Sequence, residues 1–284
     1  MEEKEKEKEK RVLWFIGTSG FSFDDWVGTV YPDYIKSSEM FNYYWQNYGF
    51  NAVELNYTFY QMPSYRTIVS LLRKSPPGFK FALKLHSSIT HDGNIENLKD
   101  FLKNTNVIKQ EGKMVGYLAQ FPYVFKYSNE HVEFLKKLAE EITSKEIELF
   151  IEFRNSTWVK RDDVWLLLKE FSPYLHIVVV DLPKLPGLYS FSTEYSAKED
   201  STYIRLHGRN PKWFTADEKT RYDYNYSESE LREIASELLS LPSTKRFVFF
   251  NNCYRGQALK NAVMFRTLVG GEKIGIFQIF RDEK

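Results

Sequence analysis

The sequence is poor in cysteine, in net charge and in long apolar runs. Its 284 residues include one cysteine, Cys253, which excludes an intrachain disulfide and a zinc site built from paired cysteines. The 39 Lys and Arg residues balance 38 Asp and Glu, a composition that disfavours binding to a bulk polyanion such as DNA. No apolar run approaches the roughly 20 residues that span a membrane, and no apolar stretch follows a basic start as in a signal peptide. We therefore expect a protein of a reducing, cytoplasmic compartment with no membrane partner.

Residues 2–10 consist only of Glu and Lys. A segment of this composition has no apolar surface to bury, so it predicts a disordered, solvated tail over 1–10. No internal repeat and no Gly/Ser linker divides the rest of the chain. We expect a single domain over 11–284.

Eight short runs rich in β-branched and aromatic residues are typical of buried strands. They begin near Leu13, Ala52, Lys80, Val115, Leu149, His176, Thr202 and Arg246. Successive starts lie 26 to 44 residues apart, which is the interval of strand–helix units and too long for a β-sandwich.

The segments between these runs have the periodicity of helices. Apolar residues of the segment from Asn129 to Thr143 fall on one face, Ser227-Glu-Ser-Glu230 is a capping box, and a last helix is predicted over Gln257–Leu268. The pattern predicts an α/β fold, a single (β/α)8 TIM-type barrel with eight helical crossovers. A doubly wound open sheet is the alternative. Two long connections, 17–38 and 208–227, directly follow strands and would lie at the C-terminal mouth of the barrel.

Polar side chains gather at the predicted strand ends. Residues two apart in a strand face the same side, and three strands end in such polar pairs. These pairs are Glu54 with Asn56, Glu152 with Arg154, and Arg205 with His207; Thr18, Ser19, Lys84, Gln120, Asp181, Asn251 and Asn252 end other strands. Because burying such groups is costly unless they pair with one another or with a ligand, the mouth is either a ligand site or a plug of mutual salt bridges.

Ordered motifs covering residues 17 to 262 resemble those of a known family. They read Gly17-Thr-Ser-Gly-Phe-Ser-Phe, Glu54-Leu-Asn-Tyr-Thr-Phe-Tyr60, Phe81-Ala-Leu-Lys84, Thr90-His91, Glu152-Phe-Arg154, Tyr203-Ile-Arg205-Leu-His207-Gly-Arg209, Tyr222-Asp-Tyr224, Asn251-Asn252 and Asn261-Ala262. The chain resembles the DUF72 (YecE-like) proteins, a family without an established biochemical function. The resemblance implies a TIM-type barrel similar in shape to xylose-isomerase-like and endonuclease IV-like barrels, and it supplies no reaction. The chain departs from the family pattern at Phe21, where Trp is usual, and at Asn155, where many members carry His.

Three residues are the catalytic candidates. Glu54 and Glu152 could flank a substrate as general acid and base, with His207 as a partner whose ordinary pKa suits proton transfer. The alternative is that Glu152 pairs with Arg154 or Arg205 and only positions them. The predicted substrate-binding residues are Thr18, Ser19, Asn56, Tyr60, Lys84, His91, Gln120, Arg154, Asp181, Arg205, Arg209, Asn251 and Asn252.

The cations of this set favour a small anionic ligand over a metal ion. Arg154, Arg205, Arg209 and Lys84 offer donors to phosphate or carboxylate, and the same charges oppose a nearby divalent metal. We predict no cofactor and no metal ligands. A single divalent metal on the acidic and histidine residues is the alternative. A nucleophilic cysteine needs a nearby base, and no motif of the family marks Cys253, so it is not predicted to be a nucleophile.

Two functions from different classes follow from these residues. The first is an enzyme, a hydrolase, lyase or isomerase acting on an anionic sugar-containing or nucleotide-like small molecule at the barrel mouth. The second is a non-catalytic barrel that binds nucleic acid or a metabolite, which the near-neutral charge disfavours for nucleic acid. The sequence leaves the oligomeric state open.

Overall fold

The computed structural model describes residues 12–196, 200–217 and 220–270. The predicted tail over 1–10 and the end of the predicted domain, 271–284, therefore lie outside the described residues.

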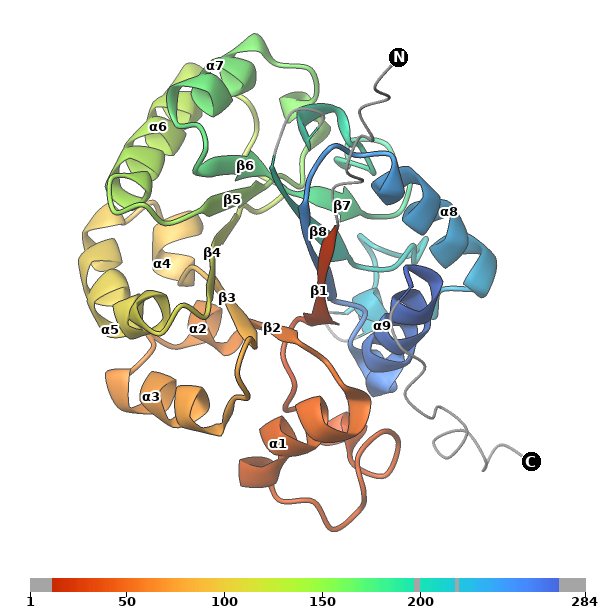
Figure 1. Ribbon diagram of the computed structural model, residues 1–284. Coiled ribbons are helices and arrows are strands. Elements are labelled where there is room, and N and C mark those ends of the chain that lie inside the picture. Colours follow the sequence, from red (N-terminus) through yellow and green to blue (C-terminus); the bar gives the residue numbers. More distant parts are fainter. Residues whose placement is uncertain (1–11, 197–199, 218–219, 271–284) are drawn as a thin grey trace, which may run out of the picture.

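Parallel strands form a ring with helices around its outside (Figure 1). The strands are β1 (Leu13–Thr18), β2 (Ala52–Leu55), β3 (Lys80–Lys84), β4 (Met114–Gln120), β5 (Leu149–Glu152), β6 (Leu175–Ile177), β7 (Val179–Asp181), β8 (Ser201–Leu206) and β9 (Lys245–Phe250). One hydrogen-bonded arc has the order β2-β3-β4-β5-β6 and the other the order β1-β9-β8-β7. Backbone hydrogen bonds from Val178 N to Ile151 O (2.9 Å) and from Gly20 N to Glu54 O (2.9 Å) join the arcs at their two ends. The predicted TIM-type barrel is confirmed.

Side chains bridge the seam between β1 and β2. Asn51 accepts a hydrogen bond from Ile16 N (2.9 Å) and donates one to Trp14 O (2.8 Å). The Tyr44 hydroxyl accepts from Thr18 N (2.9 Å) and donates to Ala52 O (3.1 Å). A Cβ at Gly17 would lie 2.0 Å from the Ala52 carbonyl oxygen, so only glycine permits this approach. These contacts fix the position of β1 along β2, and so they place Thr18, Ser19 and Glu54 at the same level of the mouth.

Helices occupy most of the intervals between the strands, as the sequence predicts. The α-helices are α1 (Ser37–Tyr48), α2 (Tyr57–Tyr60), α3 (Tyr65–Lys74), α4 (Ser87–Thr90), α5 (Leu98–Gln110), α6 (Asn129–Thr143), α7 (Asp162–Glu170), α8 (Glu228–Leu239) and α9 (Gln257–Leu268). Short 3-10 turns are η1 (Asp24–Trp26), η2 (Ile95–Asn97), η3 (Ser156–Trp158), η4 (Glu194–Ser196), η5 (Thr220–Tyr222) and η6 (Tyr254–Gly256). The predicted bounds of α6 and α9 and the capping box of α8 are confirmed.

The region around the sixth strand differs from the prediction. The expected strand is split at Val178 into β6 and β7. We predicted eight helical crossovers, but of the residues described between β7 and β8 only the 3-10 turn η4 is helical. Pro183 and Pro186 stand in this connection, and a proline disfavours helix at the residue before it.

Aromatic side chains fill the barrel interior beneath the mouth. The rings of Tyr203 and Phe150 lie 4.6 Å apart, and those of Tyr203 and Phe249 lie 5.1 Å apart. Phe15 stacks on Phe247 at 5.1 Å. This layer closes the ring from below and supports the polar residues above it. Among the residues that the structure describes, every helix is too short or too polar to cross a membrane.

The capping box of α8 provides a local test of the fold. The Ser227 side chain accepts a hydrogen bond from Glu230 N, and the Glu230 side chain accepts one from Ser227 N. We expect Ser227→Ala to lower the free energy of unfolding by about 1 kcal/mol, because the first turn of α8 loses its cap. Ser236→Ala, on an exposed face of the same helix, is the control and should change stability by less than about 0.5 kcal/mol. Urea denaturation measures both, and equal effects would contradict the role of the cap.

Candidate functional site

Arg205 and Glu54 form the deepest ion pair of the mouth. Arg205 projects from β8, and its Nε and Nη2 donate to the two carboxylate oxygens of Glu54 at 2.9 and 2.7 Å. The Tyr203 hydroxyl donates to Glu54 as well, at 2.7 Å. Both residues of the pair are buried. Glu54 and Arg205 thus form a bidentate ion pair that links β2 to β8 across the barrel. The sequence predicts them separately, as a catalytic and a binding residue.

Glu152 is the second acidic centre of the mouth, and it contacts three basic side chains. Arg205 Nη1 donates to its Oε2 at 2.7 Å. Its Oε1 lies 2.7 Å from Arg154 Nε and 3.2 Å from His207 Nε2. Burial alone would raise the pKa of Glu152, but Arg154, Arg205 and His207 outweigh it and hold that pKa well below its usual value. Glu152 is therefore a fixed carboxylate that orients its neighbours.

His207 is held between Glu152 and an amide. Asn251 Nδ2 lies 2.8 Å from His207 Nδ1, and with that amide donating, the ring proton sits on Nε2, facing Glu152. Burial, and then the charge of Arg154, lowers the pKa of His207 well below its usual value. The histidine is thus neutral and locked in one tautomer.

Lys84 differs from the arginines in having no anionic partner. Its Nζ lies 3.8 Å from the centre of the Phe59 ring, and no carboxylate of the described residues is within ion-pair distance. Burial, followed by the charge of Arg205, lowers the pKa of Lys84 to about 7, against the opposing effect of Glu152. A buried amine that is partly neutral at pH 7 therefore stands at the end of β3.

Exposure separates the mouth residues into two groups. Glu54, Glu152 and His207 are 0% exposed, whereas Lys84 and Arg154 are 7% exposed and Gln120 and Asn251 are 8% exposed. The acidic groups and the histidine thus lie underneath, and the residues that still reach solvent are cations and amides. The part of the mouth that reaches solvent is therefore positively charged and rich in hydrogen-bond donors.

Arg209 and Asp181 form a second network, apart from the first. Arg209 Nε and Nη2 donate to Asp181 at 3.0 to 3.1 Å, and Tyr226 donates to the same carboxylate at 2.6 Å. Arg209 also reaches Glu230 at 3.3 Å. These contacts tie β7 to the segment that precedes α8. Arg209 and Asp181, both predicted as binding residues, thus contact each other. Their ion pair holds the segment before α8 over the mouth.

Several other predicted binding residues make local contacts. Ser19 Oγ lies 3.4 Å from Arg205 Nη2, and Thr18 Oγ1 donates to Gly20 O at 2.6 Å. Gln120 donates to Phe121 O at 2.8 Å. Asn252 donates to Tyr224 O (2.8 Å) and to Asn261 Oδ1 (2.7 Å), which attaches α9 to the loop before α8.

The remaining predicted residues lie around α2 and α4: Asn56 directly precedes α2, Tyr60 ends it, and His91 directly follows α4. Asn56 is half-buried, and its Oδ1 is a buried acceptor without a hydrogen-bond partner in the described part of the chain. Tyr60 is exposed and packs edge-on against Phe59. His91 also packs edge-on against Phe59, with the ring centres 4.9 Å apart. This packing and the charge of Lys84 lower the pKa of His91 to about 4. Phe59, Lys84 and His91 thus form one cluster.

Sequence reasoning missed the residues that hold the functional side chains. Tyr203 orients Glu54, and Tyr226 holds Asp181 and also accepts from Gly208 N at 2.8 Å. Trp213 is buried and lies against Arg154, with 5.4 Å between guanidinium and ring. Periodicity could place Tyr203 inside the barrel two residues before Arg205, whereas Tyr226 and Trp213 depend on loop geometry.

Two further options from the sequence are a metal site and a reactive cysteine. Over residues 12–196, 200–217 and 220–270, no three His, Cys, Asp or Glu side chains gather closely enough to hold a metal ion. Burial raises the pKa of the Cys253 thiol well above its usual value, and its Sγ lies 3.5 Å from Ser19 O. Cys253 is therefore a thiol rather than a thiolate.

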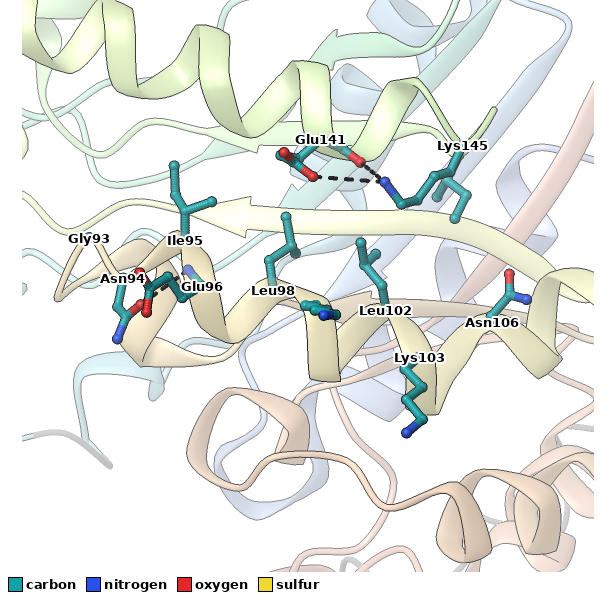
Figure 2. Close-up of a pocket in the computed structure, with 12 residues that line it drawn as sticks. Gly93, Asn94, Ile95, Glu96, Leu98, Leu102, Lys103, Asn106, Glu141 and Lys145 are labelled. Carbon is teal, nitrogen blue, oxygen red and sulfur yellow. Dashed lines mark hydrogen bonds and ion pairs between the residues drawn. The ribbon is translucent and has the colours of Figure 1, made fainter.

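A groove of about 1030 Å³ lies on the outside of the barrel, between α5 and the end of α6 (Figure 2). All of its lining residues lie in 93–106 or 141–147. Its floor is apolar, with Leu98 and Leu102 buried, and its rim carries charged residues such as Glu141 and Lys145, which pair at 3.8 Å. The groove lacks the convergent polar groups of the mouth, so the mouth is the candidate site.

The chain matches the family described as "Protein of unknown function DUF72" over residues 15–280. The chain belongs to the DUF72 family. It is 27% identical to the UPF0759 protein YunF of Bacillus subtilis over 92% of this chain and 96% of that protein. It is 41% identical to the DUF72 protein TM1631 of Thermotoga maritima, whose crystal structure superposes with a TM-score of 0.82 over 90% of this chain and 99% of that one.

The fold of this DUF72 chain also resembles that of a protein outside the family. It superposes on a D-psicose 3-epimerase crystallised with D-fructose with a TM-score of 0.51 and 11% identity, over 92% of this chain and 100% of that one. At that identity, the likeness concerns the barrel alone.

The two departures from the DUF72 pattern have structural roles here. Asn155 accepts a hydrogen bond from Thr157 N (3.0 Å) and donates to Tyr123 O (2.8 Å), so it caps η3. Phe21 packs on Phe41 with 5.1 Å between ring centres. Neither residue contributes an ionisable group to the mouth.

Proposed function

We propose that this protein is an enzyme that binds a small anionic, sugar-containing or nucleotide-like molecule at the barrel mouth and moves a proton on it, as a hydrolase, a lyase or an isomerase does. The observation that carries the proposal is the division of the mouth by exposure. Cations and amides face outward, and the acids that balance the charge lie beneath them. Such a surface recognises an anion without becoming a sealed plug.

Arg154 supplies the fixed charge for the anion. Its Nε pairs with Glu152, whereas Nη1 and Nη2 form no hydrogen bond with any residue that the structure describes. Glu152 below and Trp213 against the guanidinium hold it in one orientation. The amides of Gln120 and Asn251 lie at the same level and offer neutral donors.

Lys84 supplies the proton-transfer group in this proposal. Its pKa of about 7 lets it both accept and donate a proton near neutral pH. Glu152 and His207, predicted from the sequence as catalytic, reach a ligand only indirectly, through Arg154 and Asn251. Glu54 acts through Arg205. We therefore assign these three residues to positioning.

The proposal invokes no cofactor and no membrane, and it places the enzyme in the cytoplasm. Its partner is a small anion. Nucleic acid is the competing ligand, and the balance of 39 basic against 38 acidic residues weighs against it.

Binding of a sugar phosphate tests the anion site. We expect the wild-type protein to bind D-ribose 5-phosphate at least tenfold more tightly than D-ribose, measured by calorimetry. Arg154→Met should remove about tenfold or more of that affinity, because a charge-assisted hydrogen bond is lost. Arg154→Lys should restore part of it by keeping the charge without the fork. Arg232→Met, at an exposed pair with Glu228, is the matched control and should bind as the wild type does.

Catalysis is tested on the same complexes. Proton and phosphorus NMR of a panel of sugar phosphates and nucleotides should reveal a converted compound with the wild type and none with Lys84→Met. Equal affinity for ribose and its phosphate would contradict the anion site. Steeply salt-dependent binding to DNA, with no preference for sugar phosphates, would support the binding-module alternative instead.

A further inference from the structure

Of the cations at the strand ends that the structure describes, Lys84 alone has no carboxylate within ion-pair distance. A buried ammonium is costly unless a carboxylate or several acceptors compensate it. Its two candidate carboxylates, Glu54 and Glu152, already serve Arg205 and Arg154 at distances of 2.7 to 2.9 Å. The arginines, which stay charged, thus hold the acids that a protonated lysine would need.

The surroundings of the Lys84 amine suit a neutral nucleophile. On one side is the face of Phe59, 3.8 Å away, which excludes water from the amine. The charged groups that act on it are Arg205 from β8, Glu152 from the end of β5, Arg154 two residues after it, and Glu54 from β2. Burial and the arginines together lower its pKa to about 7. An amine of this kind attacks carbonyl groups at neutral pH.

We propose that the Lys84 amine forms a covalent imine with the carbonyl carbon of its substrate, so that the substrate is an anionic aldehyde or ketone. This deepens the proposed function and rests on it for the anion. The amine nitrogen adds to the carbonyl carbon, and the carbon–nitrogen double bond replaces the carbon–oxygen bond. The carbonyl oxygen leaves as water with the two amine hydrogens, so the step needs no oxidant or reductant.

A second titratable side chain shares the Phe59 contact with Lys84. His91 packs edge-on against Phe59, and its Nδ1 lies 3.0 Å from Thr90 Oγ1. The charge of Lys84 reaches the ring, and the pKa of His91 of about 4 leaves it neutral at pH 7. A neutral His91 adds no positive charge beside the amine, and solvent water supplies the proton with which the hydroxyl of the carbinolamine departs.

Reductive trapping tests the imine on the intact wild-type chain. The protein is incubated at pH 7 with D-glyceraldehyde 3-phosphate or with D-glyceraldehyde, each with sodium cyanoborohydride, and modified lysines are located by peptide mass spectrometry. We expect Lys84 to be labelled at least tenfold faster than exposed lysines such as Lys103, because far more of its amine is neutral. The phosphate form should label Lys84 faster than the neutral aldehyde, and Arg154→Met should remove that advantage.

The outcomes separate the inference from the function on which it rests. Equal labelling of Lys84 by the two aldehydes would uphold the nucleophile and overturn the anion site. Labelling spread over exposed lysines, with Lys84 unmodified in a protein that binds D-ribose 5-phosphate, would overturn the imine and leave the anion site standing. Lys84→Met, checked for folding by circular dichroism, should lose only the fast labelling event.

Discussion

Replacing Glu54 with Ala should lower the free energy of unfolding by about 3–5 kcal/mol, which is a large part of the stability of a domain. Glu54 accepts two hydrogen bonds from Arg205 and one from Tyr203. Arg205 is 1% exposed, so without Glu54 it keeps a buried charge with only Glu152 opposite it. Leaving one member of a buried pair uncompensated is far more costly than the pair's net contribution.

An exposed pair gives the matched comparison. Glu141→Ala removes the partner of Lys145 at 3.8 Å on the surface of α6, and both side chains are about half exposed. That change should stay within about 0.5 kcal/mol, since such pairs contribute little. Urea denaturation of both variants at pH 7 measures the difference. If Glu54→Ala costs no more than Glu141→Ala, Arg205 is reached by water or by another acid, and the buried bridge is absent in solution.

The barrel could be predicted from the sequence because its signals are local. Runs such as Leu149–Glu152 and the interval between them depend on hydrophobic pattern, and the bounds of α6 follow from one amphipathic period. The seam at Asn51 and Tyr44 could not be predicted, because its hydrogen bonds join residues up to 37 positions apart. Neither could the break at Val178, since apolar residues continue through it without a gap.

The candidate site was predicted as a set of residues but not as an arrangement. Glu54, Lys84, Glu152 and Arg205 lie at or near the carboxyl ends of their strands. The sequence therefore predicts that they meet at one mouth of the barrel. Which cation pairs with which acid depends on the length and direction of side chains in the ring. Arg205 reaches both acids from β8, so Lys84 on β3 is left without one. That difference between two cations of equal charge underlies the different roles that we propose for them.

The stability of the protein should rise by about 2–3 kcal/mol between pH 7 and pH 9 through Lys84. The pKa of this amine is about 7 in the folded chain against the ordinary 10.5 of an unfolded one. At a pH between these two pKa values, the unfolded chain binds a proton at this amine and the folded chain does not. Proton binding therefore favours the unfolded chain, and it does so most at the lower pH. Each pH unit upward removes about 1.4 kcal/mol of that penalty.

Comparison with Lys84→Met isolates this contribution, because the variant has no amine to titrate at that position. The other charged groups that face Lys84, namely Arg205, Arg154, Glu152 and Glu54, are present in both proteins. Urea denaturation at pH 7, 8 and 9 should therefore give a rising difference between wild type and variant. Lys103→Met, at an exposed lysine, should follow the wild type throughout. Parallel curves for the wild type and Lys84→Met would mean that the amine stays protonated in the folded protein. An ammonium of that kind could hold an anion but could not attack a carbonyl carbon, so this measurement decides between the two uses of Lys84 before any substrate is known.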